Sequence, residues 1–308
     1  MPSWGISATI KAPTAEILRF AAYHLEAGAQ RLFIYLDDDN IDAFEALKAH
    51  PKIRVTLCDD ARWNGKRPKK HQVRQTRNAT HAYRRRNTVD WLIHMDVDEF
   101  LVADRPIADI LAALPGDAPI ARIRPMEQLA GDGTAFKGFV PNGPGRARII
   151  SALYPTYGTY VKGGFLSHLA GKVFVRTGLD DIKVQIHNVF QNDAMLLGPE
   201  DTPGIALAHC HAKTWSDWLA AYRYRLEQGS YRADLAPNRP RDQGGMSMHE
   251  LFTQIETRDG EAGLRAFFDE VCADTPALRQ KLADHGLLRV VDLDLNTTIS
   301  KHFPQTGP

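Results

Sequence analysis

The segment VDWLIHMDVDEFLV, residues 89–102, joins an apolar run to three carboxylates, Asp96, Asp98 and Glu99. An apolar run of this kind is typical of a strand that is buried on both faces of a sheet. Like charges so close together repel one another and resist burial. The segment therefore predicts a buried strand that ends in an acidic cluster, and that cluster needs a positive counter-charge nearby.

The residues before this segment alternate strand-like runs with amphipathic helical stretches. Thr14 is placed to cap the first helix and Gly28 to end it. Such alternation predicts an α/β fold with a mainly parallel sheet flanked by helices. We expect strands at 5–12, 31–36 and 52–58, and helices at 14–28, 43–49 and 72–86.

A second acidic run, Asp37 to Asp39, directly follows the predicted strand 31–36. In open α/β sheets ligands bind beyond the carboxyl ends of the parallel strands. We therefore expect the acidic runs 37–39 and 96–99 to share one edge of the sheet.

The rest of the chain is less regular in its middle and helical towards its end. We expect a first domain over 1–230 and a helical extension, 231–308, packed on it. The tail 297–308 is expected to fray. Further strands are expected at 119–126, 172–177 and 183–190, a long loop at 131–148, and helices at 216–229, 247–260 and 263–273.

Composition indicates an ordinary folded protein of 308 residues, with 44% hydrophobic residues, 24% charged residues and a formal net charge of +1. Its three separated cysteines argue against a disulfide scaffold and for a reducing compartment. The first residues lack the pattern of a secretory signal, and no apolar run reaches the ~20 residues of a membrane helix. We expect a cytoplasmic protein, with peripheral membrane contact left open.

The chemistry of the acidic cluster points to a metal ion. Mg²⁺ and Mn²⁺ prefer carboxylate oxygens and bridge readily to phosphates. In an extended segment residues two apart point the same way, so Asp96 and Asp98 would converge on one ion while Val97 faces the core.

Several motifs also resemble one enzyme family. WLIHMDVDEFLV looks like the metal-binding segment of family-two-like glycosyltransferases with the nucleotide-sugar-binding GT-A fold. Residues 19–40, 71–86, 171–176 and 209–229 resemble the family's neighbouring helices and strands, in the same order. The resemblance covers about residues 5–230 and implies a GT-A-like sheet that is mixed but mainly parallel. Two positions depart from the family pattern: Ala12-Pro13 and Arg19-Phe20 replace its usual acidic and Glu-Trp residues, which leaves the base-contacting end of the site open.

The resemblance implies transfer of a hexose from a UDP- or GDP-linked donor to a saccharide or lipid-linked acceptor, as in polysaccharide biosynthesis. It implies inversion and a Mn²⁺ or Mg²⁺ ion that stabilises the departing diphosphate. Asp98 would bind the ion, and Asp96 would contact the ion or the ribose. Glu99 would support them or face the acceptor.

Other site residues follow from the same resemblance. His209 would complete the metal site, and a zinc site at 209–211 is the alternative. His209 and His211 would face the same side of a strand. Lys213 would reach a phosphate from the start of the next helix. Lys172 and Arg176 would contact phosphate or acceptor, or lie on a solvated strand edge.

The nucleoside would be contacted by Asp38 or Asp39, whose carboxylates accept hydrogen bonds. The basic stretch 66–86 contains no acid. Arg74 and Arg77 would hold the diphosphate or balance the acidic motif, and 84–86 would be a solvated face.

Direct displacement with inversion at the anomeric carbon also needs a general base, in the acceptor half of the site, that takes the proton of the acceptor hydroxyl. Glu200 and Asp201, in the loop GPEDTPG, are the first candidates; the others are Asp180, Asp181 and Asp193. Two other classes of function stay open: another metal-dependent nucleotide or phosphate enzyme, and a noncatalytic RNA- or membrane-binding module that uses the basic stretch. With the net charge near zero, no nucleic-acid partner is expected.

Overall fold

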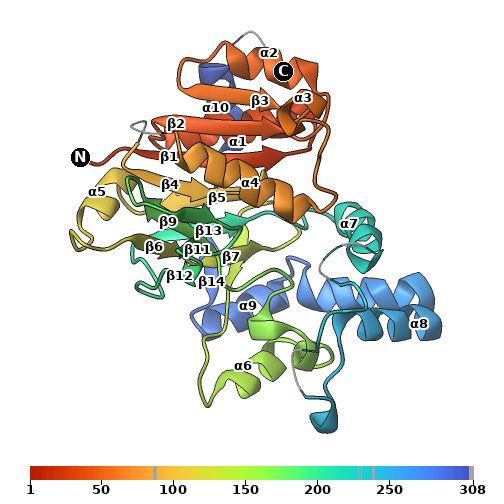
Figure 1. The fold of residues 1–308 in the computed structure, drawn as a ribbon. Coiled ribbons are helices and arrows are strands. Elements are labelled where there is room, and N and C mark those ends of the chain that lie inside the picture. The colour runs from red at the N-terminus through yellow and green to blue at the C-terminus, as the bar shows by residue number, and fades with distance from the viewer. Residues whose placement is uncertain (86–88, 228, 230, 238–239, 305–308) are drawn as a thin grey trace. The chain divides into compact units, whose positions relative to one another are not determined.

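The computed structural model describes residues 1–85, 89–227, 229, 231–237 and 240–304 (Figure 1). The chain divides into two compact units, and each contains segments that are distant in sequence. Unit 1 consists of Met1–Arg124, Ala170–Leu207 and Asp294–Pro308, and unit 2 of Pro125–Leu169 and Ala208–Leu293. The expected domain boundary at residue 230 falls inside unit 2.

Unit 1 is built on a six-stranded mixed sheet in the order β3-β2-β1-β4-β9-β6. The first four strands are parallel, whereas β9 runs antiparallel to both β4 and β6. The expected α/β fold with a mainly parallel sheet is therefore confirmed. The strands are β1 (Trp4–Ile10), β2 (Arg31–Leu36), β3 (Ile53–Leu57), β4 (Trp91–His94), β6 (Ile120–Ile123) and β9 (Lys172–Arg176).

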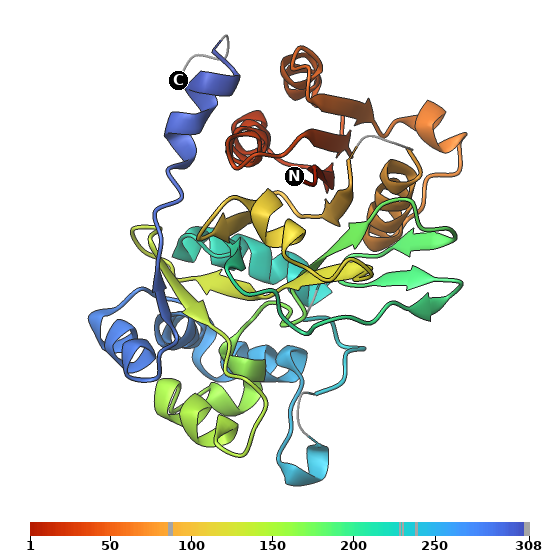
Figure 2. The same ribbon diagram turned by 90° about the vertical axis from the view of Figure 1, so that its left-hand side faces the viewer.

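Helices cover both faces of this sheet, and Figure 2 shows α1 and α4 on opposite sides of the parallel strands. All seven residues of β1 are buried, as expected for a strand with two covered faces. The helices of unit 1 are α1 (Thr14–Glu26), α2 (Ile41–Lys48), α3 (Asp60–Trp63), α4 (His71–Tyr83), α5 (Ile107–Ala112) and α10 (Leu295–His302).

The start of the first helix and the C-terminal tail differ from expectation. Pro13, not Thr14, is the N-cap of α1, and the Thr14 hydroxyl donates to Asn40 Oδ1 at 2.9 Å. Residues 295–302 are not frayed: they form α10, which packs on α1 and is tied to Glu26 by Lys301 and His302. The last four residues lie outside the described ranges. Gly28, with φ +98°, follows the end of α1 as predicted.

The strand expected at 183–190 is a hairpin. β10 (Ile182–Val184) and β11 (Val189–Gln191) pair antiparallel, because the chain turns between Gln185 and Asn188. β12 (Ala194–Met195) completes this small sheet. In another sheet, β5 (Glu99–Ala103) lies beside β13 (Ile205–His209), and Asp104 N–H donates to the Gly204 carbonyl.

Unit 2 contains β7 (Pro125–Gln128), β8 (Ala135–Gly138) and β14 (Leu288–Val290), with β8 antiparallel to both others. The long loop expected at 131–148 is therefore wrong: the pairing partners of β8 stabilise a strand inside it. The single strand expected at 119–126 proves to be two strands, β6 and β7. The helices of unit 2 are α6 (Arg146–Leu153), η1 (Gly158–Tyr160), η2 (Lys162–Gly164), α7 (Trp215–Glu227), η3 (Arg241–Gln243), α8 (Met248–Val271) and α9 (Pro276–Asp284).

An aromatic core holds the helices of unit 2 together. Trp218 is fully buried, and its ring lies 5.9 Å from Phe252 and 6.0 Å from Phe267. The rings of Phe252 and Phe267 are 4.9 Å apart although both belong to α8. That contact is possible because α8 breaks at Gly260 (φ 60°, ψ −145°) and folds back on itself. The two helices expected on either side of residue 260 are thus confirmed.

Among the described residues, no helix combines the length and the apolar character that crossing a bilayer requires.

A glycine sets the start of β9. Gly171 has φ +65°, and a β-carbon there would overlap the carbonyl oxygen of Ile123. We predict that Gly171→Ala lowers the free energy of unfolding by roughly 2–4 kcal/mol, because it combines backbone strain with overlap. Gly178→Ala is the matched control, since Gly178 has φ +88° but open space around it; we expect about 1–2 kcal/mol there. Urea denaturation of both variants measures the difference, and equal losses would contradict the overlap.

Candidate functional site

The carboxyl edge of the parallel strands carries both acidic runs, as the sequence predicts. β2 and β4 both lie parallel to β1 and flank it. Asp37 N–H donates to the Ile10 carbonyl at the end of β1, and Met95 N–H donates to the Ser7 carbonyl. The edge therefore gathers residues that are about sixty positions apart in the sequence.

Asp37 is the buried anchor of the first run. Arg74 Nη2 lies 2.6 Å from Asp37 Oδ2, Arg67 Nη2 lies 2.9 Å from Oδ1, and His71 Nδ1 lies 3.4 Å from Oδ2. Burial alone would raise the pKa of Asp37, but the hydrogen bonds from His71 and Arg74 and the two guanidinium charges lower it. Asp37 therefore stays ionised and ties α4 and the loop before it to the sheet.

Asp96 is the anchor of the second run, and Lys172 is its counter-charge. Lys172 Nζ lies 2.7 Å from Asp96 Oδ2 and 3.2 Å from Glu99 Oε2, and the lysine is fully buried. Burial lowers the pKa of Lys172, but the two carboxylates outweigh it and raise the pKa above its usual range. In turn, Lys172 holds the pKa of Asp96 well below normal against the opposite effect of burial.

The strand order explains why Lys172 supplies this charge. Because β9 runs antiparallel to β4, with Ile93 opposite Phe174, its first residue lies level with the end of β4. β9 lies inside the sheet, between β4 and β6, so the solvated strand edge considered for Lys172 and Arg176 is wrong.

The segment 96–99 is a tight turn and not an extended strand. Glu99 N–H donates to the Asp96 carbonyl at 3.1 Å, and Asp96 N–H donates to Glu99 Oε2 at 2.8 Å. The alternation expected for Asp96 and Asp98 is therefore wrong, and Val97 is half-buried at the tip of the turn beside Asp98. The buried Glu99 carboxylate supports the turn, and its expected role towards a metal ion or an acceptor stays a prediction.

Helix α4 connects the two anchors. Arg74 binds Asp37, while the next residue, Gln75, donates from Nε2 to Asp96 Oδ1 at 2.5 Å. The positive charge of Arg74 thus compensates the negative charge of the first acidic run and not that of the motif at 96–99. Arg77 is exposed, as are Arg84 and Arg85; Arg86 lies outside the described residues.

His94 is a site residue that sequence reasoning missed. It is buried at the end of β4, and within the described part of the chain neither ring nitrogen has a hydrogen-bond partner. Burial, followed by the nearby Lys172 charge, lowers the pKa of His94 to about 3. A neutral imidazole therefore lies beside the Asp96–Lys172 pair.

The remaining predicted residues of unit 1 are more exposed. Asp38 is half-buried and Asp39 is exposed, directly after β2. The Glu200 side chain is 94% exposed and lies 3.6 Å from Arg124, and Asp201 is exposed in the same loop. Their roles stay predictions.

Unit 2 holds the histidine motif. The His209 and His211 rings lie 4.9 Å apart, which confirms that they face the same side. His209 ends β13, whereas Lys213 is exposed two residues before α7. His211 is buried with Nε2 3.8 Å from Glu127 Oε1. The metal role of His209 and the phosphate role of Lys213 stay predictions.

Unit 2 also contains a buried ion pair that the sequence did not reveal. Lys137 Nζ lies 3.1 Å from Glu127 Oε2 and donates to the Val271 carbonyl at 2.8 Å. Glu127 accepts hydrogen bonds from the backbone N–H groups of Leu166 and Ser167. Burial raises the pKa of Glu127, but the charge of Lys137, then that of His211 and the hydrogen bonds from Ser167, bring it down to about 2.

The donor groups at this edge decide whether a divalent ion fits there. Within the described ranges, no three or more His, Cys, Asp and Glu side chains are arranged to hold a metal ion. However, Mg²⁺ and related ions are commonly held by one or two carboxylates together with substrate phosphates. Asp98 is half-buried at the tip of the turn beside Asp96. Its single carboxylate suits an ion that is also bound by a substrate phosphate, and it does not form a preformed metal centre.

Comparisons with known proteins give only distant likenesses. No protein-family model and no curated protein matches the chain. The chain is similar to a crystal structure of GalNAc-T7 with UDP, GalNAc and Mn²⁺ (11% identity, TM-score 0.38, 99% of this chain and 58% of that one). It is also similar to an inositol-1-phosphate CTP transferase from T. maritima (10%, TM-score 0.35, 77% and 99%). A 4-diphosphocytidyl-2C-methyl-D-erythritol synthase from Anaerococcus prevotii gives 7% identity and TM-score 0.34 over 73% of this chain and 99% of that one. At these values the likenesses carry no conclusion about function.

We predict that Lys172→Met destabilises unit 1 by about 3 kcal/mol, because it leaves Glu99 and the partly exposed Asp96 without their counter-charge. Lys183→Met, on the exposed position of β10, is the matched control and should change the free energy of unfolding by less than about 0.5 kcal/mol. Urea denaturation measures both, and a Lys172 variant as stable as the control would contradict the assigned role.

We predict that acid weakens unit 2 through Glu127. Its folded pKa of about 2 lies below the ordinary value of 4.5, so its stabilising effect is complete above pH 4.5 and is lost as pH falls towards 2. Glu127→Gln should be less stable at pH 7 and should lose less stability per pH unit in this window, by at most about 1.4 kcal/mol. Urea titrations from pH 6 to pH 3 test the slope, and parallel profiles for the two proteins would contradict it.

Proposed function

We propose that the protein is a glycosyltransferase that moves a sugar, with inversion, from a nucleotide-diphosphate donor to a saccharide or other hydroxyl acceptor. One observation carries this proposal: two carboxylate runs share the carboxyl edge of four parallel strands and are tied to one helix, α4. Ligands of open α/β sheets bind at this edge. The resemblance of residues 91–102 to the metal-binding segment of GT-A enzymes supports the same class.

The roles of the chain's residues follow from their contacts. Asp98, with Asp96 beside it, would hold a Mn²⁺ or Mg²⁺ ion that neutralises charge on the departing diphosphate. Lys172 and Gln75 keep Asp96 ionised and oriented. Asp38 and Asp39, at the other end of the edge, would accept hydrogen bonds from the nucleoside.

Glu200 or Asp201 is proposed as the general base. Glu200 and Asp201 are exposed carboxylates in one loop, and either would accept the proton of the acceptor hydroxyl only in a donor complex that orders that loop. The metal role of His209 and the phosphate role of Lys213 rest on the family resemblance alone.

The contacts weaken the alternative of an RNA- or membrane-binding module. Arg67 and Arg74 belong to the basic stretch, but both bind Asp37 and so contribute little net charge to a binding surface. A phosphohydrolase or nucleotidyltransferase would use the same edge, and the reaction products distinguish it.

We predict that UDP or GDP raises the melting temperature only together with Mn²⁺, whereas Mn²⁺ alone has little effect, because the phosphates complete the ion's coordination. Asp98→Asn should weaken nucleotide binding at least tenfold and change the melting temperature of the unliganded protein by less than about 3 °C. Differential scanning fluorimetry and isothermal titration measure these effects.

Asp42→Asn, on the exposed face of α2, is the charge-matched control and should bind like the unmodified protein. Mass spectrometry of a panel of UDP- and GDP-sugars then tests the reaction. A transferred sugar supports the proposal, whereas nucleotide binding unaffected by Asp98→Asn, or hydrolysis to nucleoside monophosphate alone, would refute it.

A further inference from the structure

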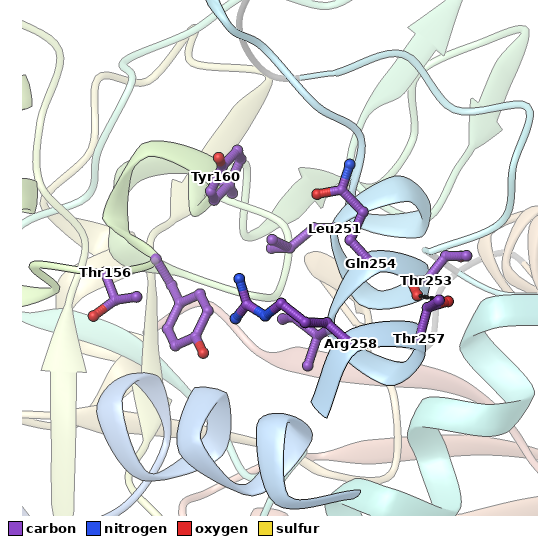
Figure 3. Close-up of a pocket in the computed structure, with 9 residues that line it drawn as sticks. Thr156, Tyr160, Leu251, Thr253, Gln254, Thr257 and Arg258 are labelled. Carbon is purple, nitrogen blue, oxygen red and sulfur yellow. Dashed lines mark hydrogen bonds between the residues drawn. The ribbon is translucent and has the colours of Figure 1, made fainter. Parts of the chain in front are cut away.

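Unit 2 contains a cavity of about 650 Å³ between the turn at 156–160 and the first half of α8 (Figure 3). Its volume is typical of pockets that bind small molecules. Arg258 and Leu251 extend from α8 towards the space that Tyr160 borders (Figure 3). The residues that line it are Thr156, Tyr157, Tyr160, Leu251, Thr253, Gln254, Ile255, Thr257 and Arg258.

The aromatic wall of this cavity is held in place by the second half of α8. Glu270 Oε1 accepts hydrogen bonds from Thr156 N–H at 2.9 Å and from Tyr157 N–H at 2.8 Å. The Tyr157 ring packs edge-on against Phe267, with centroids 5.0 Å apart. A wall fixed before the ligand arrives lowers the entropic cost of binding.

The cavity combines an apolar floor with a polar rim. Leu251 and Ile255 are buried at 5% and 4% exposure. Gln254 and Arg258 are exposed and four residues apart, so they lie on one face of α8. Gln254 offers one hydrogen-bond acceptor and two donors, and Arg258 offers several donors.

The charge of the rim is balanced. Arg258 Nη2 lies 2.6 Å from Asp259 Oδ2, and both side chains are at the surface. None of the nine lining residues named above is acidic. Because Asp259 offsets the charge of Arg258 and the lining offers both apolar side chains and hydrogen-bonding groups, the cavity suits a neutral ligand that has both an apolar face and many hydroxyl groups.

We propose that this cavity binds a neutral saccharide. The carbon–hydrogen face of a sugar ring would pack on Tyr157 or Tyr160, while its hydroxyl groups would exchange hydrogen bonds with Gln254 and Arg258. The identification of that saccharide as the acceptor rests on the proposed function; the binding itself does not.

A printed array of neutral hexose and N-acetylhexosamine oligosaccharides, with sulfated oligosaccharides as a second set, tests the proposal on the full chain. The neutral oligosaccharide that gives the strongest array signal is then measured by isothermal titration. We expect Gln254→Ala combined with Arg258→Ala to weaken its binding at least tenfold. Both side chains are exposed, so the variant should retain its melting temperature.

Arg265→Ala is the matched control, because Arg265 is also an exposed arginine of α8, paired with Asp269, but does not line the cavity. Its binding should equal that of the unmodified protein. Absence of binding on the array, binding of sulfated sugars only, or equal binding by the double variant would overturn the proposal. Asp98→Asn should keep saccharide binding, so a failure of the nucleotide test and a failure of this one are distinguishable.

Discussion

The structure of unit 1 depends on one buried, positively charged side chain. Lys172 is fully buried and contacts both Asp96 and Glu99, so it makes an acidic turn possible at the end of a buried strand. Its position follows from topology, because an antiparallel β9 places its first residue beside the last residues of β4. A buried pair of this kind is costly to break and contributes more to a defined geometry than to net stability.

The same principle recurs at the other end of the edge and in unit 2. Asp37 is surrounded by arginine and histidine side chains, and Glu127 is paired with Lys137. In each case a buried carboxylate holds together segments that are distant in the sequence. Asp37 and Glu127 are almost fully buried, whereas Asp38, Asp96 and Asp98 are partly exposed at the edge of the sheet.

Sequence patterns located most strands and helices of unit 1. The strands were found because continuous apolar runs indicate burial on both faces of a sheet. The patterns also placed the two acidic runs at one edge, since parallel strands end together. They did not identify Lys172 as the counter-charge or resolve β10 and β11, because both depend on pairing between strands that are far apart in the chain. Nor did they find Glu127 and Lys137, since a single charged residue in a short strand looks like a surface residue until its partner is known.

The return of α10 to α1 bears on how the chain is made. Unit 1 is assembled from three segments, and the segment that begins at Asp294 follows all of unit 2 in the sequence. During synthesis from the N-terminus, unit 2 can thus close before unit 1 has received its last helix. The surface of α1 that α10 covers, which includes Arg19 and Glu26, stays accessible to chaperones, or to another nascent chain, until that helix emerges from the ribosome.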